Sequence, residues 1–335
     1  MPGTATIIRS ASPRPKTSMD LTQHRVNTLR RLAFWCAMLV LVITSLSAFI
    51  RLSQAGLGCT PWPGCFGSAL QAAQHGVVLP VGDSAAVQVA RLAHRVIATV
   101  ALAGVLALVA LCLVGRPRRW GDGLLALLAL LLTVGLAVLG VWTRGARVPA
   151  VALGNLLGGM LLVAVCWRIA TGAARPVRAG HQGSTAVTAV ATLVSLALLG
   201  QIGLGALTSA SYAGLSCSGL LDCLQSSQAA HWRWDMLDPW REPVWDAEVL
   251  PVHGAAAVTQ LVHRLGAMVL TVLLLALAAL AMRDARRRLA LLLLLLLALQ
   301  LVAGVLMVAT GLALPIALAH NLLASMMLAV ALRLI

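Results

Sequence analysis

The chain has 335 residues, of which 60% are hydrophobic and only 10% are charged, so it carries far more apolar surface than a soluble domain can bury. This composition predicts an integral membrane protein. The net charge of +15 would suit a nucleic-acid partner, but the arginines lie between apolar runs, so nucleic-acid binding is not expected. Only ten acidic residues are present, and the third to eighth runs have none in their interior, which excludes a proton pump built on intramembrane carboxylates.

Residues 1–32 are polar and lack the apolar core of a cleaved signal peptide, so we expect a disordered cytoplasmic tail. Eight apolar runs follow, each of about 18 residues or more and therefore long enough to cross a bilayer as a helix. They occupy residues 33–50, 87–114, 121–143, 148–170, 186–208, 256–282, 288–310 and 313–333. The expected fold is an all-α integral membrane protein with eight transmembrane helices.

Basic residues gather before the first run and after the second, fourth and sixth runs. These are alternate connections, so the positive-inside rule predicts that all of them, and both termini, lie in the cytoplasm. The residues are Arg25, Arg30, Arg31, Arg116, Arg118, Arg119, Arg168, Arg175, Arg178, Arg283, Arg286, Arg287 and Arg288.

The two halves of the chain repeat each other. A pair of cysteines six residues apart follows the first and the fifth runs, and a His-Arg pair opens the second and the sixth. The matched residues are Cys59 and Cys65 with Cys217 and Cys223, and His94-Arg95 with His263-Arg264. The offset is 158 residues for the cysteines and 169 for the His-Arg pairs. We therefore predict two tandem pseudo-symmetric four-helix bundles, residues 33–175 and 186–335.

The fourth and eighth runs also match, but in two registers. Asn155 and Asn321 each precede a Leu-Leu pair, so these asparagines are partners if no residue is skipped. With a slip of one residue, Asn155 instead replaces His320. One residue rotates a side chain by about 100° around a helix, so the two registers predict different geometries.

The extracytoplasmic loop of the second half, residues 209–255, contains four of the nine tryptophans and six of the ten acidic residues. Tryptophan at this density is typical of a segment that lies at the membrane interface. A surface that covers a ligand or docks a partner is the alternative interpretation.

Three histidines lie near the outer ends of their runs: His94, His263 and His320. A single intramembrane histidine is often a hydrogen-bonded packing residue. Two imidazoles that face each other across a four-helix bundle favour a six-coordinate haem instead. A closed zinc site needs four ligands, and no cysteine or acid is expected at this depth. We therefore expect His263 and His320 to hold a haem, with Arg95 and Arg264 either pairing with haem propionates or simply reaching the interface.

The cysteines divide by compartment. The pairs Cys59 with Cys65 and Cys217 with Cys223 lie outside, where thiols oxidise, so two local disulfides are expected. Their role is to fix the loops, or to exchange electrons with a substrate. Three further cysteines, in or beside the spans, are expected to be inert buried thiols. Two isolated amides, Gln201 and Gln300, are explained by hydrogen bonds between helices.

Eight spans in two halves, the segment Gly56-Leu-Gly-Cys-Thr-Pro-Trp-Pro-Gly-Cys65, the two His-Arg pairs and His320 together resemble the haem A synthase family of cytochrome oxidase assembly proteins. That family oxidises the C8 methyl of haem O to a formyl group. The resemblance implies a haem b on His263 and His320, haem O as the substrate near His94, and a bacterial-type inner membrane. It also implies a haem O synthase and an electron donor as partners, and leaves homo-oligomerisation open.

Two positions depart from the family pattern. The family often has Glu three residues before the first His-Arg, where this chain has Arg91, and a second histidine in the fourth span, where it has Asn155. The first half would then hold its haem through His94 alone, with one coordination position open. A haem carrier that leaves haem unchanged and a diheme electron-transfer cytochrome are therefore alternative functions.

Overall fold

The computed structural model describes residues 16–57, 59, 65–68, 72, 84–114, 118–143, 148–172, 185–229, 232, 234–243, 254–284 and 286–335. Arg116, Arg175, Arg178 and parts of the tryptophan-rich loop lie outside these residues. In the described part of the chain all regular structure is helical, and eight helices are long and apolar enough to cross a membrane. They are α1 (Lys16–Gln54), α3 (Ala85–Leu113), α4 (Trp120–Trp142), α5 (Pro149–Gly172), α6 (Thr185–Ala210), α8 (Gly254–Arg283), α9 (Arg287–Ala309) and α10 (Leu314–Leu334). The predicted all-α multi-pass membrane fold is confirmed.

The segment before the first helix is shorter than predicted, because α1 begins at Lys16. The prediction of a disordered segment was therefore wrong for residues 16–32, and residues 1–15 lie outside the described part. Packing explains the extra turns: Val26 and Leu29 are buried, and the Arg25 guanidinium donates a hydrogen bond to the carbonyl of Leu111 on α3. These contacts continue the helix beyond the apolar run that defined it in the sequence.

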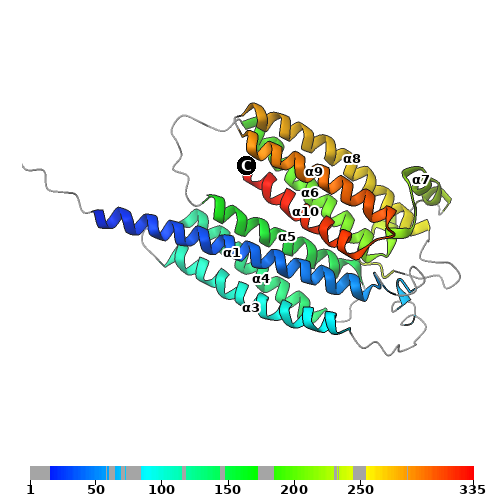
Figure 1. Cartoon of the computed structure of the whole chain (residues 1–335), viewed down its shortest axis with the longest axis horizontal. Helices are drawn as coiled ribbons and strands as arrows, with labels where there is room; N and C mark the ends of the chain where they lie inside the picture. The colour runs from blue at the N-terminus through cyan, green and yellow to red at the C-terminus, as the bar shows by residue number, and fades with distance from the viewer. Residues whose placement is uncertain are drawn as a thin grey trace, which may run out of the picture.

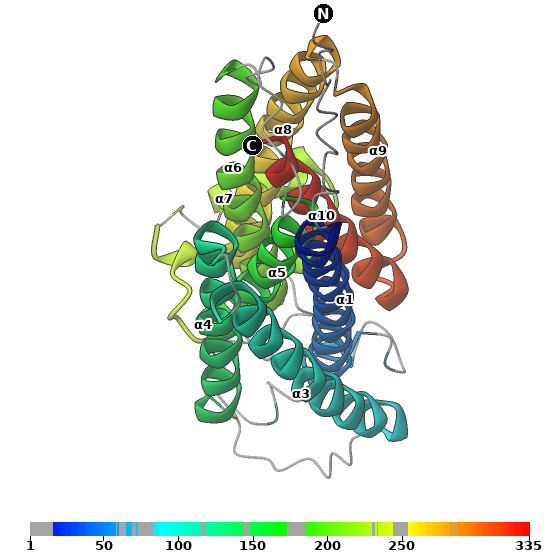
Figure 2. The same cartoon turned by 90° about the vertical axis from the view of Figure 1, so that its left-hand side faces the viewer.

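The helices pack as two groups of four that lie side by side (Figures 1 and 2). In the first group α1 and α4 each contact both α3 and α5; in the second, α6 and α9 each contact both α8 and α10. It follows that α3 and α5, and likewise α8 and α10, stand at opposite corners of their groups. The groups meet where α5 contacts α6 and α10, and where α1 contacts α10. This arrangement is consistent with two tandem bundles.

One hydrogen bond joins matching positions of the two halves. Arg51, near the end of α1, donates from Nη1 to Oγ of Ser209, near the end of α6, over 2.7 Å. The two residues are 158 apart in the chain, which is the offset between the cysteine pairs. Equivalent ends of the two bundles therefore meet at their interface.

The loops at the opposite end from Lys16 are fixed by disulfides. Cys59 pairs with Cys65 and Cys217 with Cys223, as predicted. The second loop forms the short helix η1 (Ala213–Leu215), the helix α7 (Leu220–Ala229), which packs on α8, and the short helix η2 (Trp234–Leu237). Trp234 and Trp240 are largely exposed, at 75% and 71%, as expected of rings at an interface.

Candidate functional site

A cavity of about 730 Å³ lies in the C-terminal group of helices, between α6, α8, α9 and α10, with side chains of α5 closing one side. Its wall is mainly leucine, valine, methionine, alanine and glycine. The polar side chains on it are Gln201, Thr208, Ser209, Ser218, Gln260, His263, Arg264, Thr271, Gln300, His320 and Asn321. An apolar cavity of this size with a few polar groups is typical of a site for a cofactor or small molecule.

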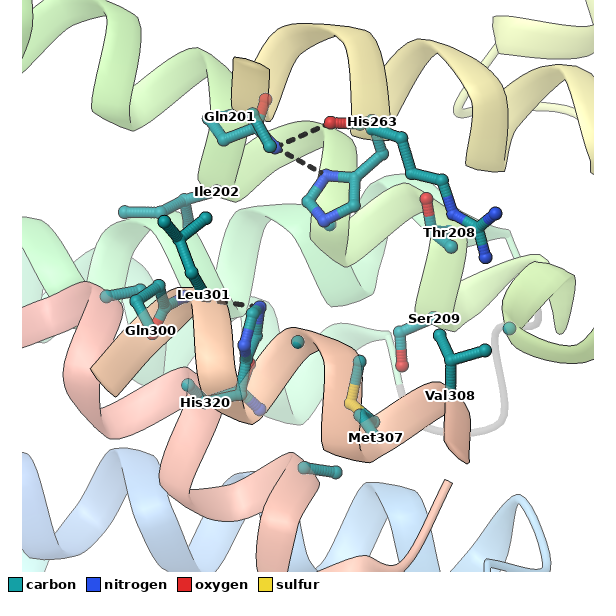
Figure 3. A pocket seen from close by; sticks show the side chains of 18 of the residues that line it. Gln201, Ile202, Thr208, Ser209, His263, Gln300, Leu301, Met307, Val308 and His320 are labelled. Carbon is teal, nitrogen blue, oxygen red and sulfur yellow. Dashed lines mark hydrogen bonds between the residues drawn. The ribbon is translucent and has the colours of Figure 1, made fainter. Parts of the chain in front are cut away.

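His263 and His320 enter this cavity from opposite sides (Figure 3). His263 lies on α8 and His320 on α10, the two helices at opposite corners of the group. The structure thus brings together the two histidines that the sequence predicted would meet. Their role as ligands stays a prediction.

Each of these imidazoles contacts an amide on a neighbouring helix. Nε2 of Gln201 on α6 lies 3.0 Å from Nδ1 of His263 and donates to the carbonyl of the same residue over 2.8 Å. Nε2 of Gln300 on α9 lies 3.1 Å from Nε2 of His320. The predicted hydrogen bonds between helices are present. The sequence did not predict that the two histidines are the partners of Gln201 and Gln300. Each glutamine is an isolated polar residue in an apolar run, and such a run does not identify the helix that faces it.

The connection between α9 and α10 explains how Gln300 reaches His320. Gly311 and Leu312 both take left-handed backbone conformations, with φ of 61° and 65°, and Pro315 stands in the first turn of α10. Glycine adopts this conformation without steric cost, and proline is compatible with a helix start. The chain therefore reverses within a few residues, and α10 runs back along α9.

Arg264 links the cavity wall to the disulfide-bonded loop. Its Nη2 donates to the carbonyl of Cys217 over 3.1 Å, and its Nη1 to Sγ of Cys223 over 3.2 Å. A guanidinium has five N–H donors, so three remain for other acceptors. In the same loop, two hydrogen bonds from Ser218, from its backbone N–H and its hydroxyl, hold the pKa of Asp222 below its usual range.

The predicted residues of the first half lie apart from this cavity. His94 is partly buried on α3, Arg95 is exposed beside it, and Asn155 is partly buried on α5. In the described part of the chain, the side chains of His94 and Asn155 make no hydrogen bond to another residue. The structure therefore places these residues on the two helices that match α8 and α10, without joining them.

Comparisons with known proteins give the chain's family. The family model for a cytochrome oxidase assembly protein matches residues 30–332. A curated relative, the heme A synthase of Shewanella oneidensis, is 34% identical over 262 residues, which cover 73% of this chain and 77% of the relative. The chain belongs to the haem A synthase family of cytochrome oxidase assembly proteins.

The cavity suits the kind of ligand expected in the haem A synthase family. Gly205 and Gly304 lie beside the two rings, and a Cβ added to Gly205 would stand only 3.0 Å from Cε1 of His263. Nδ1 of His320 is buried without a hydrogen-bond partner in the described part of the chain. Among the described residues, no cluster of three or more His, Cys, Asp or Glu could hold a bare metal ion. Two opposed imidazoles in an apolar cavity fit a haem, whose macrocycle supplies the other four ligands.

Proposed function

We propose that this chain is a haem A synthase that oxidises the C8 methyl of haem O to a formyl group by successive hydroxylations, for cytochrome oxidase biogenesis. The observation that carries the proposal is the placement of His263 and His320 on opposite sides of one apolar cavity. Family membership supports the substrate and the reaction class. The enzyme would lie in a bacterial-type inner membrane with both termini in the cytoplasm, receiving haem O from a haem O synthase and electrons from a separate donor.

In this proposal His263 and His320 hold a resident haem b. Bound between two imidazoles, a haem supplies one-electron transfer without an open coordination position. The chain contributes its orientation: apolar side chains of α6, α9 and α10 exclude water from the macrocycle, and Arg264 at the outer edge receives a propionate. The disulfide-bonded loop holds that guanidinium in place.

The substrate haem O would be held in the N-terminal group of helices. His94 is the proposed ligand to its iron and Arg95 the partner of a propionate. Asn155 on α5 is the residue that replaces His320 if the register of the two halves slips by one. An asparagine is a poor ligand to haem iron, which leaves one coordination position of the substrate open. With dioxygen as the oxidant, each hydroxylation would insert one oxygen atom, while two electrons from the donor and two protons reduce the other atom to water. The first would give an alcohol, and the second a geminal diol that loses water to form the aldehyde.

A haem carrier is the second candidate function. The partly buried, unpaired state of His94 and Asn155 among the described residues favours it, because a built reaction site normally orients its ligands through hydrogen bonds. Such a carrier would bind haem O and release it unchanged.

The two functions separate in one experiment. The chain is expressed in cells that make haem O but have no other haem A synthase, and the haems are extracted and identified. New haem A is expected from the wild type, and none from His94→Ala. Haem O bound unchanged at stoichiometric level would instead establish the carrier. His24→Ala, an exposed histidine of α1 outside both sites, is the matched control and should behave as wild type.

A spectrum of the purified protein tests the assignment of the halves. Loss of the low-spin haem signal is expected in His263→Ala and His320→Ala, and its retention in His94→Ala. The reverse pattern would contradict the assignment.

A further inference from the structure

The contact between Gln201 and His263 is built from both sides of the interface between α6 and α8. Gly205, one turn after Gln201, leaves room for the imidazole, since an added Cβ would lie 3.0 Å from its Cε1. Gly266, in the turn after His263, leaves room for the amide, since an added Cβ would lie 2.4 Å from Oε1 of Gln201. The His263 ring therefore packs over Gly205 of α6, and the Gln201 amide packs over Gly266 of α8. Neither side chain could move without losing its contact with the glycine of the opposite helix.

Gln201 also holds two groups of the same residue. Its amide nitrogen donates to the backbone carbonyl of His263 and faces the ring nitrogen Nδ1 (Figure 3). The contact lies on the ring nitrogen nearer the backbone, so Nε2 is left for the cavity. Gln300 differs, because it meets Nε2 of His320.

The arrangement is found only in the second half of the sequence. At the offset of 158 residues, Ile43 and Ser47 stand where Gln201 and Gly205 would be, and at the offset of 169, Ile97 stands in place of Gly266. The first half keeps the histidine, His94, but has neither the amide nor the two glycines. The second half alone has the residues that fix one orientation of the ring.

We propose that Gln201 is a positioning residue for His263, fixing the orientation and the proton of its imidazole and thereby the reduction potential of the haem held there. The inference rests on the proposed bis-histidine site. In this structure the amide nitrogen of Gln201 faces Nδ1 and donates to the carbonyl of His263, whereas ligation through Nε2 requires the proton on Nδ1. On ligation, a half-turn of the amide about its terminal bond would present Oε1 to that proton as its acceptor, in exchange for the bond to the carbonyl. An acceptor on the far nitrogen makes the imidazole a stronger donor to iron and favours the ferric state.

The test compares two replacements of similar size with opposite chemistry. Gln201→Met removes the acceptor, so the haem reduction potential should rise. Gln201→Glu supplies a stronger acceptor, so the potential should fall. We expect about a tenfold change in the ferric/ferrous equilibrium in each direction, which for one electron is about 59 mV. The readouts are a potentiometric titration and the electron paramagnetic resonance spectrum of the low-spin ferric haem in the purified, haem-loaded protein.

Gln260 provides the matched control. It is a buried glutamine of α8, the helix that carries His263, and it lines the same cavity. Its amide donates to the carbonyl of Gly214 and, among the described residues, makes no hydrogen bond to either imidazole. Gln260→Met should leave the potential unchanged, and Gln260→Glu measures the effect of added charge alone. Gly266→Ala, which displaces the amide without altering it, should shift the potential in the same direction as Gln201→Met.

The inference would be overturned if the Met and Glu variants of Gln260 shifted the haem reduction potential as much as those of Gln201. It would also be overturned if Gln201→Met and Gln201→Glu shifted the potential in the same direction. Failure of the proposed function looks different: the wild type would then bind no low-spin haem, or would keep it in His263→Ala. If Gln201→Met does not fold, Gly266→Ala and Gln201→Glu still decide the matter.

Discussion

Replacing Arg264 by leucine removes the guanidinium that stands beside His263 at the edge of the cavity. Two of its donors hold the carbonyl of Cys217 and the sulfur of Cys223, and the remaining three are free for a propionate. A hydrogen bond from a charged donor contributes about 1.5–3 kcal/mol. Since about 1.4 kcal/mol is a factor of ten in affinity, Arg264→Leu should weaken haem b binding roughly 10- to 100-fold.

The assay is the rate and extent of haem transfer from the detergent-solubilised protein to an excess of a high-affinity haem acceptor. Arg264→Lys keeps the charge but cannot form the same pair of bonds, so it should fall between wild type and Arg264→Leu. Arg95→Leu, at the matching position of the first half, is the control and should leave haem b retention unchanged. Wild-type retention in Arg264→Leu would refute the role of this side chain at the propionate.

Three further outcomes are expected. Replacing Cys217 and Cys223 by serine should lower stability by about 2–4 kcal/mol, the usual contribution of a disulfide, which thermal unfolding with and without reductant measures. It should also speed haem release, measured by haem transfer to the acceptor, because the partners of Arg264 become mobile. Cys36, Cys112 and Cys166 are buried, so a membrane-permeant maleimide should label them only after denaturation, and labelling of the native protein would contradict their placement. Reporter fusions at the two termini should both report the cytoplasm, and an external signal from either would reverse the predicted orientation.

The sequence was sufficient for most of the fold because a membrane span is a local property. A run of about 18 apolar residues predicts a helix whatever lies beside it. Contacts with neighbouring helices decide where the helix ends, which is why the start of α1 was misplaced: the burial of Val26 and Leu29 depends on packing in the first bundle.

The site divides in the same way. The topology predicted that His263 and His320 would come together, since the two spans between the starts of their helices return the chain to the same side of the membrane. It could not predict that Gln201 and Gln300 would meet them, because that depends on the rotation of α6 and α9 about their own axes. The surroundings of His94 are likewise a matter of tertiary packing, and the two possible registers of Asn155 could not be separated by pattern alone.

The bond between Arg51 and Ser209 joins positions that the repeat makes equivalent. If a single four-helix unit formed a symmetric dimer, any residue on the two-fold axis would meet its own copy. Two arginines there would repel each other, and two serines would leave no cation between the halves. Joining both units in one chain removes that restriction, because each copy of the position can then change independently. A polar pair of unlike residues at the interface between the two halves is a contact that a homodimer of one unit could not have made.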